Sequence, residues 1–378
     1  MKYREFGKTG LKVSALGFGT MRLPLLEDGV TVDEKEAVRI IRHAIDSGVN
    51  YVDTAYPYHQ GTSEIVVGKA LRDGYRDKVF LADKSPIWKL EKESDFDSIL
   101  EEQLQKLQTD HIDFYLLHAL NKERFEKIKN LHLIDHMLEA RKAGKIRYLG
   151  FSFHDDLEVF KQIVDYTDQW DFCQIQYNYI DTQVQAGDKG YELAAKMGVP
   201  MVIMEPVKGG RLANLPEEAK EALNEADPDR SAASWALRWV GSHENVKVIL
   251  SGMSSMEQLE DNLETFGKFQ PLTEAEEEAV EKAADLIRSR VKNGCTSCRY
   301  CMPCPFGVNI PEMFSIWNNC AMFDEEEKAK KAYAEQKVQD ASADLCKKCG
   351  ACEKACPQGL SIRADLEKVA KELNTEEA

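Results

Sequence analysis

Four side chains that can act together on a carbonyl group stand at the ends of short apolar runs or just after one. Asp53, Lys84 and His118 end NYVD, KVFLADK and IDFYLLH, and Tyr58 follows in the loop TAYPYHQG. A lysine ammonium favours the charged form of a nearby phenol, so we expect Lys84 to lower the pKa of Tyr58. Such a phenol can act as a general acid near neutral pH, with Asp53 orienting the lysine and His118 donating to a carbonyl oxygen. These residue types predict acid–base chemistry at a carbonyl.

A second chemistry is indicated by eight of the ten cysteines, which form two tight groups near the end of the sequence. Three thiolates at three-residue intervals can hold one face of a four-iron cluster, and in two-cluster ferredoxins the remote Cys-Pro of each group ligates the other cluster. The expected ligand sets are Cys295, Cys298, Cys301 with Cys356, and Cys346, Cys349, Cys352 with Cys304. Structural zinc in two four-cysteine sites is the rival interpretation, although zinc sites usually pair two C-x₂-C motifs across a longer gap.

The two cysteine groups differ in one spacing. The second group matches the bacterial C-x₂-C-x₂-C-x₃-C-P run, whereas the first has only two residues between Cys301 and Cys304. This shorter spacing weakens the case for Cys304 as a ligand of the other cluster, and Cys320 is an alternative. Cys173 is expected to be an ordinary strand residue.

The elements that must position the first four residues alternate regularly. Eight apolar runs are expected as strands, each followed by a helical stretch, which predicts a parallel sheet. Eight such units in about 260 residues are typical of a closed (β/α)₈ TIM barrel, here preceded by a β-hairpin around GKTG. An open doubly wound sheet is less favoured because no G-x-G-x-x-G follows the first strand. The runs are VSALGFG and residues 50–55, 78–84, 112–118, 146–152, 171–177, 200–206 and 246–252.

The barrel prediction also brings the polar strand ends together. Active sites of such barrels lie at the carboxyl ends of the strands. Asp53, Lys84 and His118 end three successive strands, so they must face one mouth. The predicted domains are the barrel at 1–270, a helical linker at 271–290 and a mainly helical iron–sulfur domain at 291–378.

Charge and hydropathy exclude several partners. The chain of 378 residues has 49 basic and 65 acidic side chains, a net charge of −16. Such a field repels nucleic acid phosphates and anionic lipid. The longest apolar runs are far shorter than the ~20 residues of a membrane helix. The start, MKYREFGKTG, has no apolar targeting segment, so a cytoplasmic protein is expected.

Residues 1–270 resemble the aldo-keto reductases, in which a (β/α)₈ barrel moves a hydride between NAD(P)H and a carbonyl carbon. The resemblance rests on LGFGTMRLP, NYVDTAYPYHQGTSE, FLADK, IDFYLLH, KIRYLGFSFH, CQIQYN, VIMEPVKGG and LSGMSSMEQLEDN, which occur in the family's order. It implies that Asp53, Tyr58, Lys84 and His118 are the catalytic residues, and that Tyr58 protonates the alkoxide. The cofactor-binding positions that it implies are Gly19, Thr20, Asp53, Ser152, Gln174, Gly252, Met253, Gln258 and Asn262.

Three positions depart from the family pattern. Phe153 replaces the asparagine that usually follows the serine, so His154 is a candidate to supply that contact. Met204 stands where an aromatic residue often stacks on the nicotinamide; a thioether can still pack against a ring. Gly252 and Gln258 replace the basic pair that often binds the 2′-phosphate, which leaves NADH and NADPH both open.

The cysteine segment resembles a dicluster ferredoxin module. The expected cofactors are therefore NAD(P)H and two [4Fe-4S] clusters, and the expected substrate is a small carbonyl compound or alcohol. The clusters either relay electrons or hold the C-terminal part together. In the alternative reading the protein is an electron-transfer protein whose clusters do the redox work with a partner protein.

Overall fold

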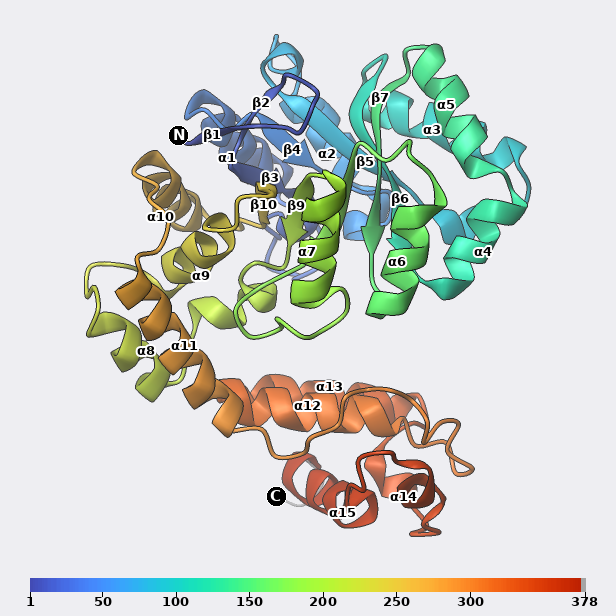
Figure 1. Cartoon of the computed structure of the whole chain (residues 1–378), viewed down its shortest axis with the longest axis vertical. Coiled ribbons are helices and arrows are strands. Elements are labelled where there is room, and N and C mark those ends of the chain that lie inside the picture. The colour runs from blue at the N-terminus through green and yellow to red at the C-terminus, as the bar shows by residue number, and fades with distance from the viewer. Residues whose placement is uncertain (375–378) are drawn as a thin grey trace. The chain divides into compact units, whose positions relative to one another are not determined.

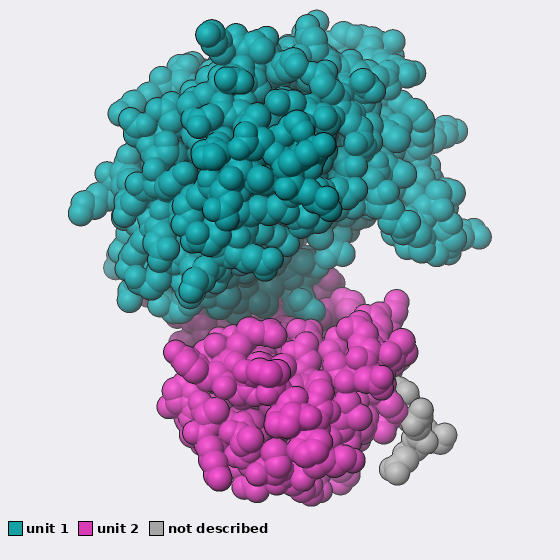
Figure 2. All heavy atoms as spheres, turned by 90° about the vertical axis from the view of Figure 1, so that its right-hand side faces the viewer, with its two compact units in different colours: residues 1–213, 230–277 teal, residues 214–229, 278–378 magenta. Residues whose placement is uncertain are grey.

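The computed structural model describes residues 1–374, so the last four residues of the predicted domain 291–378 lie outside the described residues. The chain forms two compact units (Figure 2). The first contains residues 1–213 and 230–277, and the second contains residues 214–229 and 278 onward. The domain limits at 270 and 290, which came from composition, stay a prediction.

The first unit is a closed barrel of eight parallel strands surrounded by helices (Figure 1), so the predicted fold is confirmed. Around the barrel the strands follow the order β10-β3-β4-β5-β6-β7-β8-β9. The antiparallel strands β1 (Tyr3–Glu5) and β2 (Lys12–Ser14) form the separate hairpin. The barrel strands are β3 (Leu16–Gly19), β4 (Tyr51–Asp53), β5 (Phe80–Ser85), β6 (Ile112–Leu120), β7 (Ile146–Phe153), β8 (Phe172–Gln176), β9 (Met201–Met204) and β10 (Val246–Ser251).

Side chains inside the barrel follow the two-residue period of a strand. A buried cluster there contains Tyr51, Ala82 and Phe114 from three neighbouring strands. The hairpin closes this interior, because Phe6 packs against Phe114 with ring centres 4.8 Å apart. Gly150 leaves the space that the Phe172 ring fills, since a Cβ at Gly150 would lie 2.5 Å from that ring. Further along each strand, the next inward-facing side chains lie near its carboxyl end.

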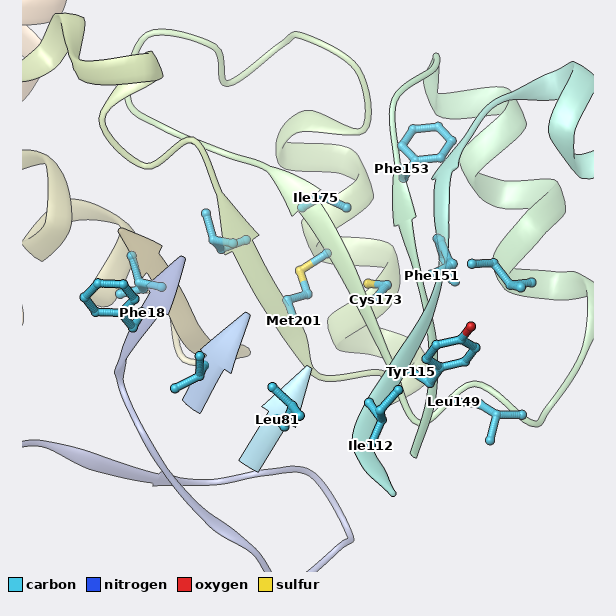
Figure 3. Packing of buried hydrophobic residues seen from close by; sticks show 14 of the residues in the cluster. Phe18, Leu81, Ile112, Tyr115, Leu149, Phe151, Phe153, Cys173, Ile175 and Met201 are labelled. Carbon is cyan, nitrogen blue, oxygen red and sulfur yellow. The ribbon is translucent and has the colours of Figure 1, made fainter. Parts of the chain in front are cut away.

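The alternate residues of the strands face outward and pack against helices. Together with the helices they form a second buried cluster, larger than the one inside the barrel. Figure 3 shows Leu81, Tyr115 and Phe151 in this cluster. A helix follows every barrel strand, as the alternation predicted, and α4 is an additional helix between β6 and α5. The helices of the first unit are α1 (Glu34–Asp46), α2 (Ser63–Ala70), α3 (Ser94–Leu107), α4 (Lys122–Asn130), α5 (Leu133–Lys142), α6 (Leu157–Tyr166), α7 (Gly187–Met197), α9 (Ala232–Gly241) and α10 (Met256–Gly267).

The second unit is helical and has its own apolar core. Val308, Phe314, Trp317 and Leu366 are buried in this core, and most of the grouped cysteines pack against its edge. The remaining helices are α8 (Glu217–Asn224), α11 (Glu274–Ser289), α12 (Ile310–Phe323), α13 (Glu326–Val338), α14 (Ala351–Ala355) and α15 (Ile362–Leu373). None of the helices within residues 1–374 is both long and apolar enough to cross a membrane.

Candidate active site and cysteine cavities

A buried ion pair forms the base of the candidate active site. Lys84, from β5, donates to Asp53 Oδ1 at 2.6 Å and to the carbonyl oxygen of Thr54 at 2.7 Å. Both charged side chains are at most 2% exposed. Burial acts to lower the pKa of Lys84, but the attraction of Asp53 and Tyr58 outweighs it, so the pKa lies above its ordinary value. Lys84 therefore stays an ammonium at neutral pH.

Tyr58 lies beside this ion pair. It begins the short helix η2 (Tyr58–Gly61), where the two residues that follow it have left-handed backbone angles. The Lys84 ammonium is 5.1 Å from the centre of the Tyr58 ring. Burial raises the pKa of the phenol above its ordinary value, and the opposing effect of Lys84 does not cancel the rise. The predicted lowering of this pKa was wrong because it left out the loss of water around the ring; the phenol stays protonated at neutral pH.

His118 completes the group from β6. Its ring meets the Tyr58 ring edge-on, with centres 6.2 Å apart. Burial, followed by the charges of Lys84, His154 and Arg124, lowers the pKa of His118 well below its ordinary value. The imidazole is therefore neutral at pH 7. The next residue, Ala119, has φ +54°, an unusual conformation for a residue with a Cβ. The structure thus brings together all four residues that the sequence singled out.

Ser152 and Gln174 stand side by side on paired strands, because β7 and β8 align these two residues. The Ser152 hydroxyl oxygen accepts from the Ala119 amide at 2.7 Å, which leaves its own proton free to be donated. Gln174 donates to the Met204 sulfur at 3.6 Å, while its Oε1 is buried without a partner. A free acceptor beside a free donor fits a carboxamide such as that of nicotinamide.

The other predicted cofactor positions lie at the end of β3, just after β3 and β10, and in the helix α10 that follows β10. Gly19 is the last residue of β3, and Thr20, which follows it, donates to the carbonyl oxygen of Asp53 at 2.9 Å. Asn262 donates to the Ser251 hydroxyl at 3.0 Å, and the exposed Gln258 accepts from the Ser254 amide at 2.8 Å. Gly252 is exposed and Met253 is buried.

One basic residue near these positions was missed. A Cβ at Gly252 would lie 2.9 Å from the Cβ of Arg22, so this arginine packs over Gly252. The segment GMSSMEQLEDN, which holds the positions of the usual basic pair, contains no lysine or arginine. Arg22 directly follows the GFGTM motif, but only the closed barrel, which pairs β10 with β3, shows that it lies here.

Behind Lys84 lies a buried polar network. Asp83 accepts from the Lys84 amide at 2.8 Å. Gln103 of α3 donates to Asp83 at 2.7 Å, to Glu64 at 2.9 Å and to the Lys84 carbonyl oxygen at 3.1 Å. Both main-chain polar groups of Lys84 therefore have side-chain partners. This network fixes the end of β5 that carries the ammonium.

The eight grouped cysteines surround two cavities in the second unit. One cavity is lined by Cys301, Cys304, Cys346, Cys349 and Cys352. The other is lined by Cys295, Cys298, Cys301 and Cys356. The structure thus brings Cys304 to the later group and Cys356 to the earlier one. Cys320, on α12, lines neither of these cavities.

The cysteine side chains line the walls of these cavities and do not cluster around a single metal position. Across residues 1–374, no three His, Cys, Asp or Glu side chains come close enough to hold a single metal ion. Cys298 and Cys349, the central cysteines of the two groups, are exposed.

Comparison with known proteins adds independent findings. Residues 15–285 match the model of the aldo/keto reductase family, and residues 294–360 match that of the 4Fe-4S dicluster domain. Aldo-keto reductase YhdN of Bacillus subtilis is 38% identical over 165 residues, 40% of this chain and 47% of that protein. L-Galactose dehydrogenase of Arabidopsis thaliana is 27% identical, over 78% of this chain and 96% of its own length.

Among solved structures, the aldo-keto reductase AKR11C1 of Bacillus halodurans, in its holo form, superposes with a TM-score of 0.63. It is 30% identical and covers 75% of this chain and 96% of its own. The dicluster match indicates two 4Fe-4S clusters, as the sequence predicted. With a family model over most of its length and the barrel that the family shares, the chain belongs to the aldo/keto reductase family of oxidoreductases and carries a 4Fe-4S dicluster domain.

Proposed function

We propose that the protein reduces a small carbonyl compound, or oxidises the corresponding alcohol, with NAD(P)H as the hydride carrier. The observation that carries the proposal is the protonated Tyr58 held beside the Lys84–Asp53 ion pair, with neutral His118 at the ring edge. An acid, a fixed cation and a neutral hydrogen-bond donor are the groups that polarise a carbonyl and protonate the alkoxide formed from it.

The proposed roles follow from this geometry. His118 donates to the carbonyl oxygen, and the nicotinamide supplies a hydride to the carbonyl carbon when it is bound. Tyr58 then gives its phenol proton to the alkoxide, and Lys84 stabilises the phenolate that remains. Asp53 keeps Lys84 charged and oriented through their 2.6 Å contact. The products are the alcohol and the oxidised cofactor.

Ser152 and Gln174 are proposed to hold the nicotinamide carboxamide, since they offer a donor and an unpaired acceptor. Met204, whose sulfur is in contact with Gln174, is proposed to pack on the nicotinamide ring. Gly19, Thr20, Gly252, Met253, Gln258 and Asn262 are proposed to contact the rest of the cofactor. Arg22, which packs over Gly252, is a basic residue beside that part of the site.

For the second unit, we propose the crossed ligand sets. Cys304 joins Cys346, Cys349 and Cys352, and Cys356 joins Cys295, Cys298 and Cys301, because these sets line the two cavities. The cysteines are free thiols, and thiols are kept reduced in the cytoplasm, so the proposal places the protein there.

A second candidate function is electron transfer through the clusters to a redox partner. The exposure of Cys298 and Cys349 favours it, because a partner can approach each cluster closely there. The two functions separate in one anaerobic experiment, in which NADH or NADPH and then a carbonyl compound are added while the visible spectrum is recorded. Bleaching by the cofactor alone couples the clusters to the nicotinamide. Turnover without bleaching supports hydride transfer confined to the barrel, and bleaching without turnover contradicts the first function.

A further inference from the structure

Near His118 lies an arginine that the proposed chemistry does not use. Arg124 is in the first turn of α4. Its guanidinium carbon lies 5.1 Å from the centre of the Trp88 ring. The Trp88 ring centre in turn is 5.2 Å from that of His118. From the proposed reacting centre, His118, Trp88 and Arg124 thus contact one another in that order.

The arginine is held in place but most of its donors stay available. Its Nη1 donates to the carbonyl oxygen of Ala119 at 2.6 Å, next to His118 in the chain. A guanidinium has five N–H donors, and within residues 1–374 this is the one hydrogen bond recorded for the Arg124 side chain. The side chain is half-buried. Such a fork is preorganised for a planar anion.

Two further observations suggest that the place is a binding surface. Trp88 is 39% exposed, although an indole ring usually buries itself. The charge of Arg124 also reaches His118 and His154, since after burial it is among the influences that lower the pKa of both rings. Arg124 therefore places a positive charge close to both histidine rings, beside one exposed aromatic side chain.

We propose that Arg124 and Trp88 select a carbonyl substrate that carries a carboxylate. The carboxylate accepts from the free donors of Arg124, the body of the substrate packs on Trp88, and the carbonyl oxygen reaches His118 and Tyr58. A charge-assisted, two-point contact of this kind gives both affinity and orientation. This inference rests on the proposed reductase function and adds the class of substrate.

The experiment compares matched pairs of aldehydes that differ only in charge: 4-oxobutanoate with 4-oxobutanamide, and 3-carboxybenzaldehyde with 3-formylbenzamide. For each pair, kcat/KM is measured with the full-length, cluster-containing protein. The wild type should prefer the carboxylate. Arg124→Gln should lower the carboxylate-to-amide ratio by about 10-fold or more, mainly through KM, as the loss of a charge-assisted hydrogen bond would. Arg124→Lys should keep part of the preference, because it keeps the charge and loses the fork.

Lys129→Gln is the matched control. It removes one positive charge from the same helix, but Lys129 pairs with Glu126 and lies over Phe125, away from Trp88. It should leave the ratio unchanged. Equal reduction of both members of a pair, or a ratio that survives Arg124→Gln, would overturn the carboxylate proposal while the reductase function stands. Reduction of no member by the wild type with either cofactor would overturn the reductase function as well.

Discussion

Lys84 and Asp53 form an ion pair across 2.6 Å at the carboxyl ends of neighbouring strands, and both side chains are almost fully buried. Burying two charges costs free energy, and such a pair is often less stable than an apolar replacement. The barrel nevertheless keeps it directly beside a protonated phenol. This placement is explained if the ammonium stabilises a negative charge that appears on Tyr58 during turnover.

The first prediction concerns the proton donor. Tyr58→Phe should reduce the rate of carbonyl reduction by roughly 10²-fold or more, because it removes the general acid. Cofactor affinity, measured by fluorescence titration, should change little. Tyr56→Phe is the control: this phenol is in the same loop but donates to Glu102. Similar losses in the two variants would contradict a specific role for Tyr58.

The second prediction concerns the ion pair. Asp53→Asn leaves Lys84 buried without its counter-charge, so the free energy of unfolding should fall by about 3–5 kcal/mol. Replacing both residues, as in Asp53→Asn with Lys84→Met, should recover part of this stability while activity stays lost. Denaturant titration, followed by a spectroscopic signal of the first unit, measures the free energy of unfolding of both variants. The exposed Glu36, paired with Arg39, is the control, and Glu36→Gln should have little effect. If the double variant is no more stable than Asp53→Asn, the unpaired charge of Lys84 is not the cause of the lost stability.

The third prediction follows from the lowered pKa of His118. In the unfolded chain this histidine takes up a proton below about pH 6.5, while the folded protein keeps it neutral. Protons therefore favour the unfolded state, and stability should fall as the pH drops below about 6.5 toward the folded-state pKa. His118→Gln should reduce this slope by up to about 1.4 kcal/mol per pH unit in that window. Parallel stability curves for wild type and variant would contradict a neutral His118.

The fourth prediction separates the candidate fourth ligands. Cys304→Ala should lose iron and the signal of one cluster in the reduced protein, because Cys304 lines the cavity with the later cysteines. Cys320→Ala should keep the iron content of the wild type. Iron and sulfide analysis with electron paramagnetic resonance measures both. The reverse pattern would assign the ligand to Cys320, and zinc in place of iron in the wild type would contradict the clusters themselves.

Much of the fold and site was predictable because the signals were local and periodic. The alternation of apolar runs and helical stretches predicted the barrel, and the polar residue after each run predicted where Asp53, Lys84 and His118 would meet. The carboxyl ends of parallel strands can meet only at one mouth, so no long-range information was needed.

The errors concern effects that depend on three-dimensional surroundings. The pKa of Tyr58 is set by the balance between burial and Lys84, and burial cannot be read from a loop sequence. Arg22 stands in LGFGTMRLP and Arg124 in a stretch without a motif, but neither was assigned a role, because only barrel closure and the contact of α4 with Trp88 show where they lie. Similarly, the spacing before Cys304 argued against a position that the folded chain provides.

The central claim is that a hydride passes directly to the carbonyl carbon, and isotope transfer tests it. The protein is supplied anaerobically with NADPH or NADH deuterated at the transferred position of C4, and with 3-carboxybenzaldehyde in ordinary water. The account predicts that each alcohol molecule gains one deuterium at the former carbonyl carbon while the visible spectrum of the clusters stays unchanged. An alcohol without deuterium, formed as the clusters bleach and recover, would contradict it.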